Sequence, residues 1–328
     1  VAATGGARLA PQGGPVNRRR LFWVLLALFI WLVVSRVDEL ARLEQVLARG
    51  AWQWVALAAA LEVAHYFANG YLSYRAMRLA GVGGSYLSYV PLAFAALFVN
   101  VTLPAAGASG IALYADSATR RGDSPAKATA AALLTHVINQ VSFVPYLVWL
   151  DLYLSARGAL SAYHALISVL FYLFALSQVG ALLLAVRHPR ELGVVLGTVE
   201  AAANWVARAL HRARFLSEGW AERSAGEFAM AAEPLRRSPR QVMALLGVSA
   251  AVHIIPMAVL AAMFRAFAAP VHAAIPAVAY VVSFLFVTIS ITPQGVGFVE
   301  EAMTSTLLAL GIPSAEAAIL PFAYRGLS

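Results

Sequence analysis

The sequence contains no cysteine in its 328 residues. This absence excludes disulfide bonds, thiolate catalysis and cysteine-ligated metal sites, although it does not identify the compartment. Charge is also scarce, because 12% of the residues are Asp, Glu, Lys or Arg while 61% are apolar. Soluble domains carry about 25% charged and about 45–50% apolar residues. So little charge cannot cover a surface that faces water, and the composition therefore predicts an integral membrane protein without an accompanying soluble enzyme domain.

The charges that are present are mostly cationic. The sequence has 24 Lys and Arg against 16 Asp and Glu, a formal net charge of +8. In so apolar a chain we expect the excess cations in loops that face anionic lipid, and not in a nucleic-acid patch. We therefore expect a multi-pass protein of the plasma (inner) membrane, with membrane lipid as its ligand and no nucleic-acid partner. A lipid-modifying enzyme as partner and a homo-oligomeric state are left open.

The chain divides into a short tail and one membrane domain. Residues 1–17 are rich in Gly, Pro and Ala and are predicted to be a disordered tail. Arg18, Arg19 and Arg20 then precede the apolar Leu21–Ser35, which lacks a small-residue cleavage site and is interpreted as a retained first span with a cytoplasmic N-terminus. Residues 18–328 form the transmembrane domain. Within it, residues 187–240 mix nine Arg with six Glu and are predicted to be a cytoplasmic amphipathic arm.

Two stretches without charge have an unusual length. A spanning helix needs about 20 mostly apolar residues, whereas Leu79–Ala115 has 37 residues and Ala266–Val299 has 34. Each is too long for one span and too short for two full spans with a turn. If each run turns back, 18 Lys and Arg share the cytoplasmic side and only Arg36, Arg42, Arg49, Arg157 and Arg265 lie outside, as the positive-inside rule favours.

The sequence therefore predicts an all-α polytopic membrane protein with about seven or eight crossings and two broken or re-entrant helical hairpins, near residues 100–119 and 290–312. Backbone that leaves a helix inside the bilayer must be buried in protein or line a cavity. Pro removes a helix donor and Gly permits tight turns. The residues that fit such breaks are Asn100, Pro104, Gly107 and Gly110 in the first run and Pro293, Gly295 and Gly297 in the second.

The two breaks correspond to each other. Pro104 and Pro293 are 189 residues apart, and the same offset pairs Gly122 with Gly311. Because the helices before the two prolines are predicted to run in opposite directions, the pair is a candidate inverted repeat. In secondary transporters this arrangement places the binding site between two broken segments. Chance matching of common residues is the alternative.

Glu300 is the first candidate for a substrate-binding side chain, because an ionisable group at membrane depth is costly and by default functional. The alternative is a structural carboxylate in the first turn after Gly297, where the helix dipole favours it. Glu301 lies on another face and is a weaker candidate. Arg325 is a natural counter-ion for Glu300 or for an anionic headgroup, and its alternative is to reach the membrane interface.

Two further polar groups lie in predicted spans. His136, Asn139 and Gln140 share one helix face by their spacing, which favours interhelical hydrogen bonding, with a substrate or proton path as the alternative. Glu62 and His65 form a similar pair that suits a proton or headgroup site, or buried hydrogen bonding. No HExxH-type pattern occurs, so we expect no metal site and no cofactor.

The segment at residues 292–302 reads Thr-Pro-Gln-Gly-Val-Gly-Phe-Val-Glu-Glu-Ala. It resembles the Pro-Gly-Gly-x-Gly-x-x-Glu-Ala motif of the lysylphosphatidylglycerol synthase transmembrane region and its stand-alone, flippase-like relatives. The Leu-Gly-Ile-Pro from Leu310 and the Gly-rich run from Pro104 also fit, and the resemblance covers roughly residues 86–325. Two positions depart from the family: Ala108 stands where many members carry Glu, so no acidic role is carried over there, and Gln294 replaces a usual Gly.

The resemblance implies a polytopic lipid-handling domain, which in the family is proposed to move a lipid between leaflets. Aminoacyl transfer in the full synthases resides in a separate soluble domain, and residues 187–240 are too few to hold one. The expected function is translocation of an anionic or glycosylated phospholipid or a polyprenyl-linked lipid. The alternatives are a membrane-embedded transferase for a lipid-linked substrate and a non-catalytic membrane subunit of a lipid-modifying complex.

Overall fold

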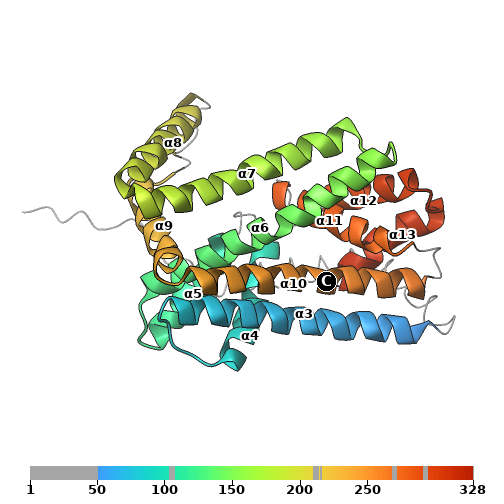
Figure 1. Cartoon of the computed structure of the whole chain (residues 1–328), viewed down its shortest axis with the longest axis horizontal. Coiled ribbons are helices and arrows are strands. Elements are labelled where there is room, and N and C mark those ends of the chain that lie inside the picture. The colour runs from blue at the N-terminus through green and yellow to red at the C-terminus, as the bar shows by residue number, and fades with distance from the viewer. Residues whose placement is uncertain are drawn as a thin grey trace, which may run out of the picture.

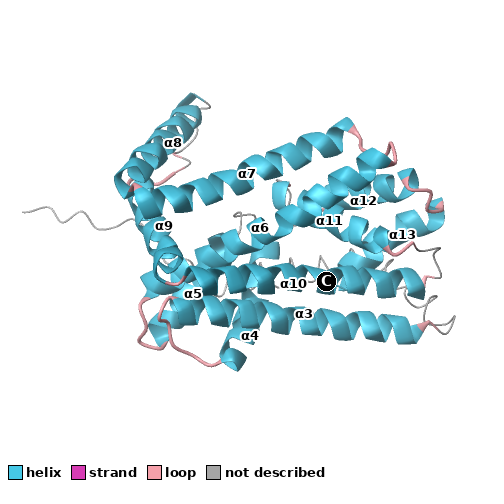
Figure 2. Cartoon of the chain, viewed as in Figure 1, coloured by secondary structure: helices cyan, strands magenta, loops and turns pink. Residues whose placement is uncertain are grey.

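A computed structural model describes residues 51–102, 108–209, 214, 216–267, 272–290 and 295–327. These residues form eleven helices and no strand (Figures 1 and 2). The helices are α3 (Trp52–Leu79), α4 (Tyr86–Thr102), α5 (Ala108–Arg120), α6 (Pro125–Ala156), α7 (Ala162–Arg187), α8 (Pro189–Ala209), α9 (Trp220–Arg237), α10 (Pro239–Ala266), α11 (Ala274–Ile289), α12 (Phe298–Ala309) and α13 (Ser314–Leu327). The predicted all-α polytopic membrane fold is confirmed. The predicted tail and first span lie outside the described residues.

Four long helices, α3, α6, α7 and α10, run along the length of the molecule, and α3 and α10 lie side by side (Figure 1). By length and composition, α6, α7 and α10 are able to cross a membrane, and α4 and α11 are shorter apolar helices. α7 leaves large side chains such as Leu166, Leu173 and Leu176 exposed. Exposed leucines are expected where a helix faces lipid tails, because an apolar side chain there contacts hydrocarbon and not water.

Local sequence sets the ends of these long helices. Ser124 caps α6 by accepting a hydrogen bond from the Lys127 N–H, and Pro125 occupies the first helical position. Both choices satisfy the unpaired donors at a helix start. Gly122 has φ of 76° between α5 and α6, a conformation that costs little only for glycine. The chain can therefore reverse within a few residues between these two helices.

The first re-entrant hairpin is formed by α4 and α5. These helices have 17 and 13 residues, or about 25 and 20 Å at 1.5 Å per residue, and their outer ends meet at one end of the molecule. There Arg121 donates from Nη2 to the hydroxyl of Tyr89 over 3.2 Å, and the loop residue Gly83 faces the carboxylate of Asp123. The chain therefore enters and returns on the same side, as the length of the charge-free run predicts.

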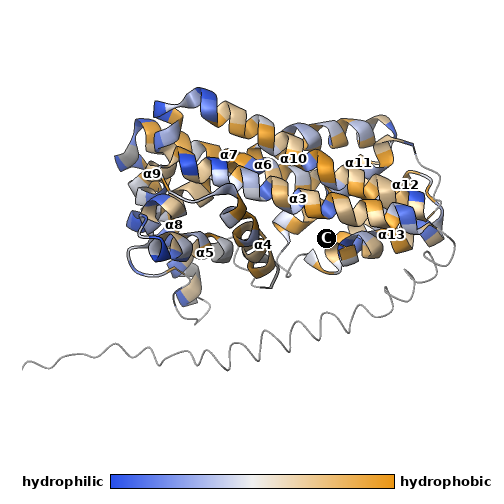
Figure 3. Ribbon diagram, turned by 90° about the horizontal axis from the view of Figure 1, so that it is seen from below, coloured by the Kyte–Doolittle hydropathy of each residue, from blue (hydrophilic) through white to orange (hydrophobic). Residues whose placement is uncertain are grey.

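The second hairpin, formed by α11 and α12, lies at the opposite end of the bundle. α11 and α12 have 16 and 12 residues, and together with α13 they lie at the end of the bundle remote from α4 and α5 (Figures 1 and 3). Opposite entry of the two hairpins is the geometry that the inverted repeat requires. The repeat itself stays a prediction, because Pro104 and Pro293 lie outside the described residues.

Charge is unequal between the two ends. The end that carries α8 and α9 also carries the loops around Arg78 and Arg121, and hydrophilic residues gather there in Figure 3. The other end holds the loop that begins at Arg157 and the end of α10 at Arg265. The loops that the positive-inside rule grouped together thus share one end. The assignment of that end to the cytoplasm stays a prediction.

The predicted arm forms α8 and α9, which lie across the end of α7 in Figure 1. α9 buries Ala231 and Ala232 against Leu72, Leu134 and other residues of the long helices. Small side chains allow this close approach. The arm therefore belongs to the folded body, while its contact with a membrane surface stays a prediction.

The largest core lies between α6, α7, α10 and α11. Phe143 is completely buried there and contacts the rings of Phe171, Tyr280 and Phe284. Aromatic packing of this kind fills the interior at crystal-like density. Phe143 therefore ties these four helices together through its neighbouring rings.

Candidate functional site

A polar stripe follows one face of α3. Its members are Glu62, His65, Asn69 and Ser73, whose spacings of three, four and four residues keep them on one side of a helix. Glu62 is only 6% exposed, and its Oε1 lies 3.3 Å from Nδ1 of His65. Asn69 donates from Nδ2 to the His65 carbonyl oxygen over 2.9 Å. The second carboxylate oxygen of Glu62 is buried without a hydrogen-bond partner in the described part of the chain.

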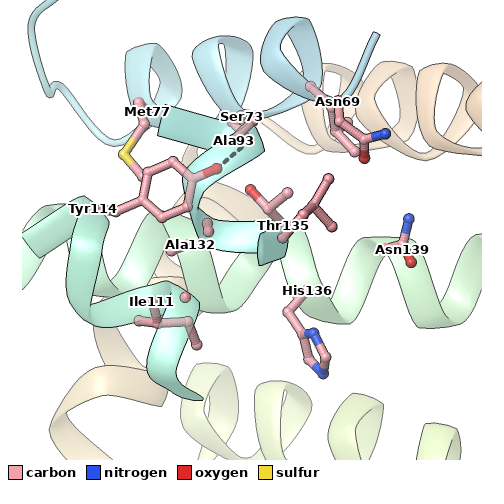
Figure 4. A pocket seen from close by; sticks show the side chains of 14 residues that line it. Asn69, Ser73, Met77, Ala93, Ile111, Tyr114, Ala132, Thr135, His136 and Asn139 are labelled. Carbon is pink, nitrogen blue, oxygen red and sulfur yellow. Dashed lines mark hydrogen bonds between the residues drawn. The ribbon is translucent and has the colours of Figure 1, made fainter. Parts of the chain in front are cut away.

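The end of this stripe that holds Asn69 and Ser73 lines a cavity of about 160 Å³ between α3, α4, α5 and α6 (Figure 4). The hydroxyls of Ser73 and Tyr114 lie 3.0 Å apart and join α3 to α5 across its wall. The polar lining consists of Asn69, Ser73, Tyr114, Thr135, His136 and Asn139, and the remainder is aliphatic, with Gly110 at the start of α5. A polar hollow thus lies inside an apolar bundle, beside the first re-entrant hairpin.

Two of these side chains are unused by the protein. His136 and Asn139, from adjacent turns of α6, make no side-chain hydrogen bond to any described residue, although Thr135 donates to the Ala131 carbonyl of its own helix over 2.8 Å. Interhelical hydrogen bonding was the favoured interpretation of this α6 face, and the structure shows none for these two side chains. Polar groups at this depth need a partner, and a ligand or water in the cavity can supply it.

Gln140 does not line the cavity. It is 4% exposed, and its Oε1 is buried without a partner among the described residues. Asn139, its neighbour in sequence, lines the cavity with His136. The side chain of Gln140 lies farther round α6 and is buried in the packed interior. Its role in substrate binding stays a prediction that the cavity does not support.

The second hairpin holds a buried ion pair. Arg325 Nε lies 3.2 Å from Glu300 Oε1, and the two side chains are 4% and 8% exposed. Glu300 Oε2 also accepts a hydrogen bond from the Gly297 N–H over 2.7 Å. The carboxylate of Glu300 therefore caps α12, as the structural alternative expects, and it pairs with Arg325. Substrate binding by Glu300 or Arg325 stays a prediction. Glu301, next along the helix, is exposed.

Glycines shape the turn before this pair. Gly295 and Gly297 have φ values of 69° and 86°, which a side chain would strain. A Cβ on Gly295 would also meet Val299 at 2.6 Å. The interpretation of these glycines as turn residues agrees with this geometry. Of the other predicted break residues, Pro104, Gly107 and Pro293 lie outside the described residues, and Asn100 is placed in α4 without a described side chain.

The stripe on α3 leads from the first hairpin toward the second. At its Glu62 end, Leu61 of α3 packs against the core that contains Tyr280 of α11 and Tyr324 of α13. α13 also packs against α3. The polar stripe thus extends from Ser73 beside α5 to Glu62, roughly 17 Å along α3, toward the end of the bundle that carries α13.

Sequence reasoning missed four of the six polar side chains that line the cavity. Asn69 and Ser73 continue the helical spacing of Glu62 and His65, so extending that stripe by two turns would have found them. Thr135 precedes His136 on the same face. Tyr114 gave no local signal, because its contact with Ser73 depends on the return of the hairpin.

Other buried polar residues connect helices and were also missed. They include the pairs Ser142–Ser249, His253–Tyr280, Thr306–His164 and Asp151–Tyr172. Each joins two helices through side chains that are satisfied by one another, which is how polar residues commonly hold membrane helices together. Within the described residues, no group of three or more His, Asp or Glu gathers as metal ligands do.

The comparison with protein families matches residues 21–328 to the lysylphosphatidylglycerol synthase TM region family. The chain belongs to this family. Neither the curated proteins nor the solved structures give a match. The lysylphosphatidylglycerol synthase TM region is a membrane domain, so the family match agrees with the apolar helices and supports a multi-pass membrane protein. The family match extends further toward the N-terminus than the resemblance at residues 86–325.

Proposed function

We propose that this lysylphosphatidylglycerol synthase TM-region protein moves a membrane lipid between leaflets, with the headgroup following the polar stripe of α3. The stripe carries the proposal. It leads from a cavity beside one re-entrant hairpin toward the end of the bundle that holds the other hairpin and α13, which packs against α3, and the two hairpins enter from opposite ends of the bundle.

The energetics of crossing support a route of this kind. A polar headgroup that enters hydrocarbon loses its hydrogen bonds to water, at several kcal/mol for each unpaired group. Asn69 and Ser73 on α3 and Asn139 on α6 can replace some of those bonds. The lipid tails need no such help, because they can stay in the bilayer beside exposed apolar residues such as Phe94 and Phe98 of α4.

The size of the cavity fits a headgroup and not a whole lipid. Its volume of about 160 Å³ is below the roughly 300–1,000 Å³ of sites that enclose drug-sized molecules. It is far above the roughly 10–15 Å³ that one water requires. A division of the lipid between cavity and bilayer is therefore the arrangement that this volume favours.

Purified protein in liposomes tests the proposal. A fluorescent lipid in the inner leaflet becomes accessible to a membrane-impermeant quencher only if it changes leaflet. We expect protein-dependent exchange without a partner, and about a tenfold loss in Asn69→Leu, the effect of roughly 1.4 kcal/mol at the barrier. The matched control is Val63→Leu, on the exposed side of the same helix.

Three results would contradict the proposal. Exchange that is equal in Asn69→Leu and wild type would remove the stripe from the route. Turnover of an activated donor onto a lipid, without exchange, would favour a transferase. Inactivity in both assays would favour a membrane subunit that acts only with a partner.

A further inference from the structure

The lining of the cavity carries hydrogen-bonding groups but no fixed charge. Asn69, Ser73, Tyr114, Thr135, His136 and Asn139 are its polar members, and no Asp, Glu, Lys or Arg is among the described residues that line it. The sequence extends this observation to α4 and the first two turns of α5, since Leu79–Ala115 contains no charged residue at all. The charges on α3 that lie nearest in sequence are Arg75 and Arg78, whose side chains are exposed, and Glu62, about two turns from Asn69.

From this lining we infer that the cavity binds an uncharged, polyhydroxylated headgroup, such as a sugar carried on a lipid, and disfavours phosphate and ammonium groups. The inference rests on the proposed function for its role in transport, but it makes a separate claim about binding. It selects the glycosylated lipids from the broader set of lipids that the sequence left open.

The chemistry of the lining supports hydroxyl groups. Amide and hydroxyl side chains both donate and accept hydrogen bonds, and so do the hydroxyls of a sugar. The unused groups are the Asn139 amide, the His136 imidazole and the remaining capacity of Asn69, whose Nδ2 already donates to the His65 carbonyl. Figure 4 shows the side chains of Asn69 on α3 and Asn139 on α6 pointing toward each other. A cluster that both donates and accepts hydrogen bonds therefore suits a sugar, whose hydroxyls also do both.

Charged headgroups fit this lining poorly. A phosphate only accepts hydrogen bonds and an ammonium only donates them, so a phosphate would leave the Asn139 amide oxygen unpaired and an ammonium would leave its amide N–H groups unpaired. Each would also give up its hydration without meeting an opposite charge, which is the most costly event in an apolar interior. Among the described residues the buried cation is Arg325 of α13, remote from this cavity, and its Nε lies 3.2 Å from Glu300 Oε1.

Native mass spectrometry of the purified protein tests the inference apart from transport. The protein is equilibrated with equal amounts of glucosyl diacylglycerol, phosphatidylglycerol and phosphatidylethanolamine with identical tails, and the retained lipids are counted. We expect about a tenfold preference for the glucosyl lipid, which corresponds to 1.4 kcal/mol. In Asn139→Leu that preference should fall to near equality. In Leu152→Ile, an exposed position on the same helix, it should be unchanged.

The outcomes separate the two proposals. Equal retention of the three lipids, or a preference for phosphatidylglycerol, would overturn the inference, and so would a glucosyl preference that survives in Asn139→Leu. A circular dichroism spectrum identical to wild type shows that Asn139→Leu is folded, and Thr135→Val gives a second cavity variant if it is not. A glucosyl preference in a protein that exchanges no lipid would refute the transport proposal and leave the binding inference standing.

Discussion

The two re-entrant hairpins differ in what they do with their polar groups. In the cavity beside α4 and α5 the described polar side chains carry no fixed charge, and those of His136 and Asn139 have no hydrogen-bond partner among the described residues. Beside α11 and α12 they are charged, and Glu300 and Arg325 satisfy each other in a packed interior. The first hairpin is therefore arranged to accept a ligand, while the second is arranged to hold its own turn and its neighbour α13 in place.

This difference changes which of the predicted site residues we expect to bind a ligand. Glu300 and Arg325 were expected to bind substrate, yet in this structure their facing groups are used on each other and on the Gly297 N–H. The neutral residues of α3 and α6 have capacity to spare. We therefore place ligand binding at the first hairpin and treat the ion pair as the element that holds the second hairpin closed.

The largest expected effect is a difference in thiol labelling between the two ends of the bundle. Because the chain has no cysteine, Arg120→Cys and Arg157→Cys each introduce a single exposed thiol, one at each end of α6. An impermeant thiol reagent added to intact cells should label one and not the other, and permeabilised cells should label both. Labelling of both from the same side would place the two hairpins on one side and break the comparison.

The ion pair should carry the largest stability effect. Arg325→Met leaves Glu300 buried without its partner, and losses of roughly 3–5 kcal/mol are typical when one member of a buried pair is removed. The free energy of unfolding in mixed detergent micelles measures this loss. Glu300→Gln keeps an acceptor for the Gly297 N–H and should lose less than Arg325→Met.

The double variant Glu300→Gln with Arg325→Met is the control, and it should recover most of the stability that Arg325→Met loses. Losses that simply add would show that the pair is not coupled. Lipid exchange by Glu300→Gln decides the functional question, because a wild-type rate in this variant would remove Glu300 from the mechanism.

Filling the cavity should affect transport more than stability. Ala96 is 5% exposed and lines the cavity from α4, so Ala96→Phe occupies the space of a headgroup. We expect lipid exchange to fall at least about tenfold, with a stability change of about 1–3 kcal/mol at most. The same substitution at Ala112, on the exposed face of α5, should leave exchange unchanged. Equal effects of the two substitutions would show that the cavity is not on the route.

The sequence predicted the architecture because two strong physical constraints acted on it. A charge-free run of 37 residues cannot end on the far side without exposing Arg120 and Arg121 there, so the length of the run and the position of the charges fix the return. The pairing of Glu300 with Arg325 followed from the cost of isolated charge at membrane depth. These constraints hold for any membrane protein and can be applied to a sequence without a structure.

The cavity was not predictable in the same way. Serine and threonine occur widely in membrane helices and often bond to their own helix, as Thr135 does with the Ala131 carbonyl, so they give no distinctive pattern. Ser73 and Tyr114 are 41 residues apart, and only the packing of α5 against α6, with α4 between α3 and α5, brings them together. Which polar residues meet across a hairpin depends on that packing.

The smallest expected effect sharpens the comparison between the hairpins. The Ser73–Tyr114 hydrogen bond joins α5 to α3 across the cavity wall, and a neutral pair of this kind contributes about 1 kcal/mol net. A double-mutant cycle with Ser73→Ala and Tyr114→Phe should give a coupling energy of that size, against several kcal/mol for Glu300 and Arg325. If the two couplings are equal, both hairpins are held equally firmly, and the first has no special freedom to admit a headgroup. If the Ser73–Tyr114 coupling is the smaller, α5 is the wall that can move most cheaply, and a ligand hydroxyl can replace the lost bond.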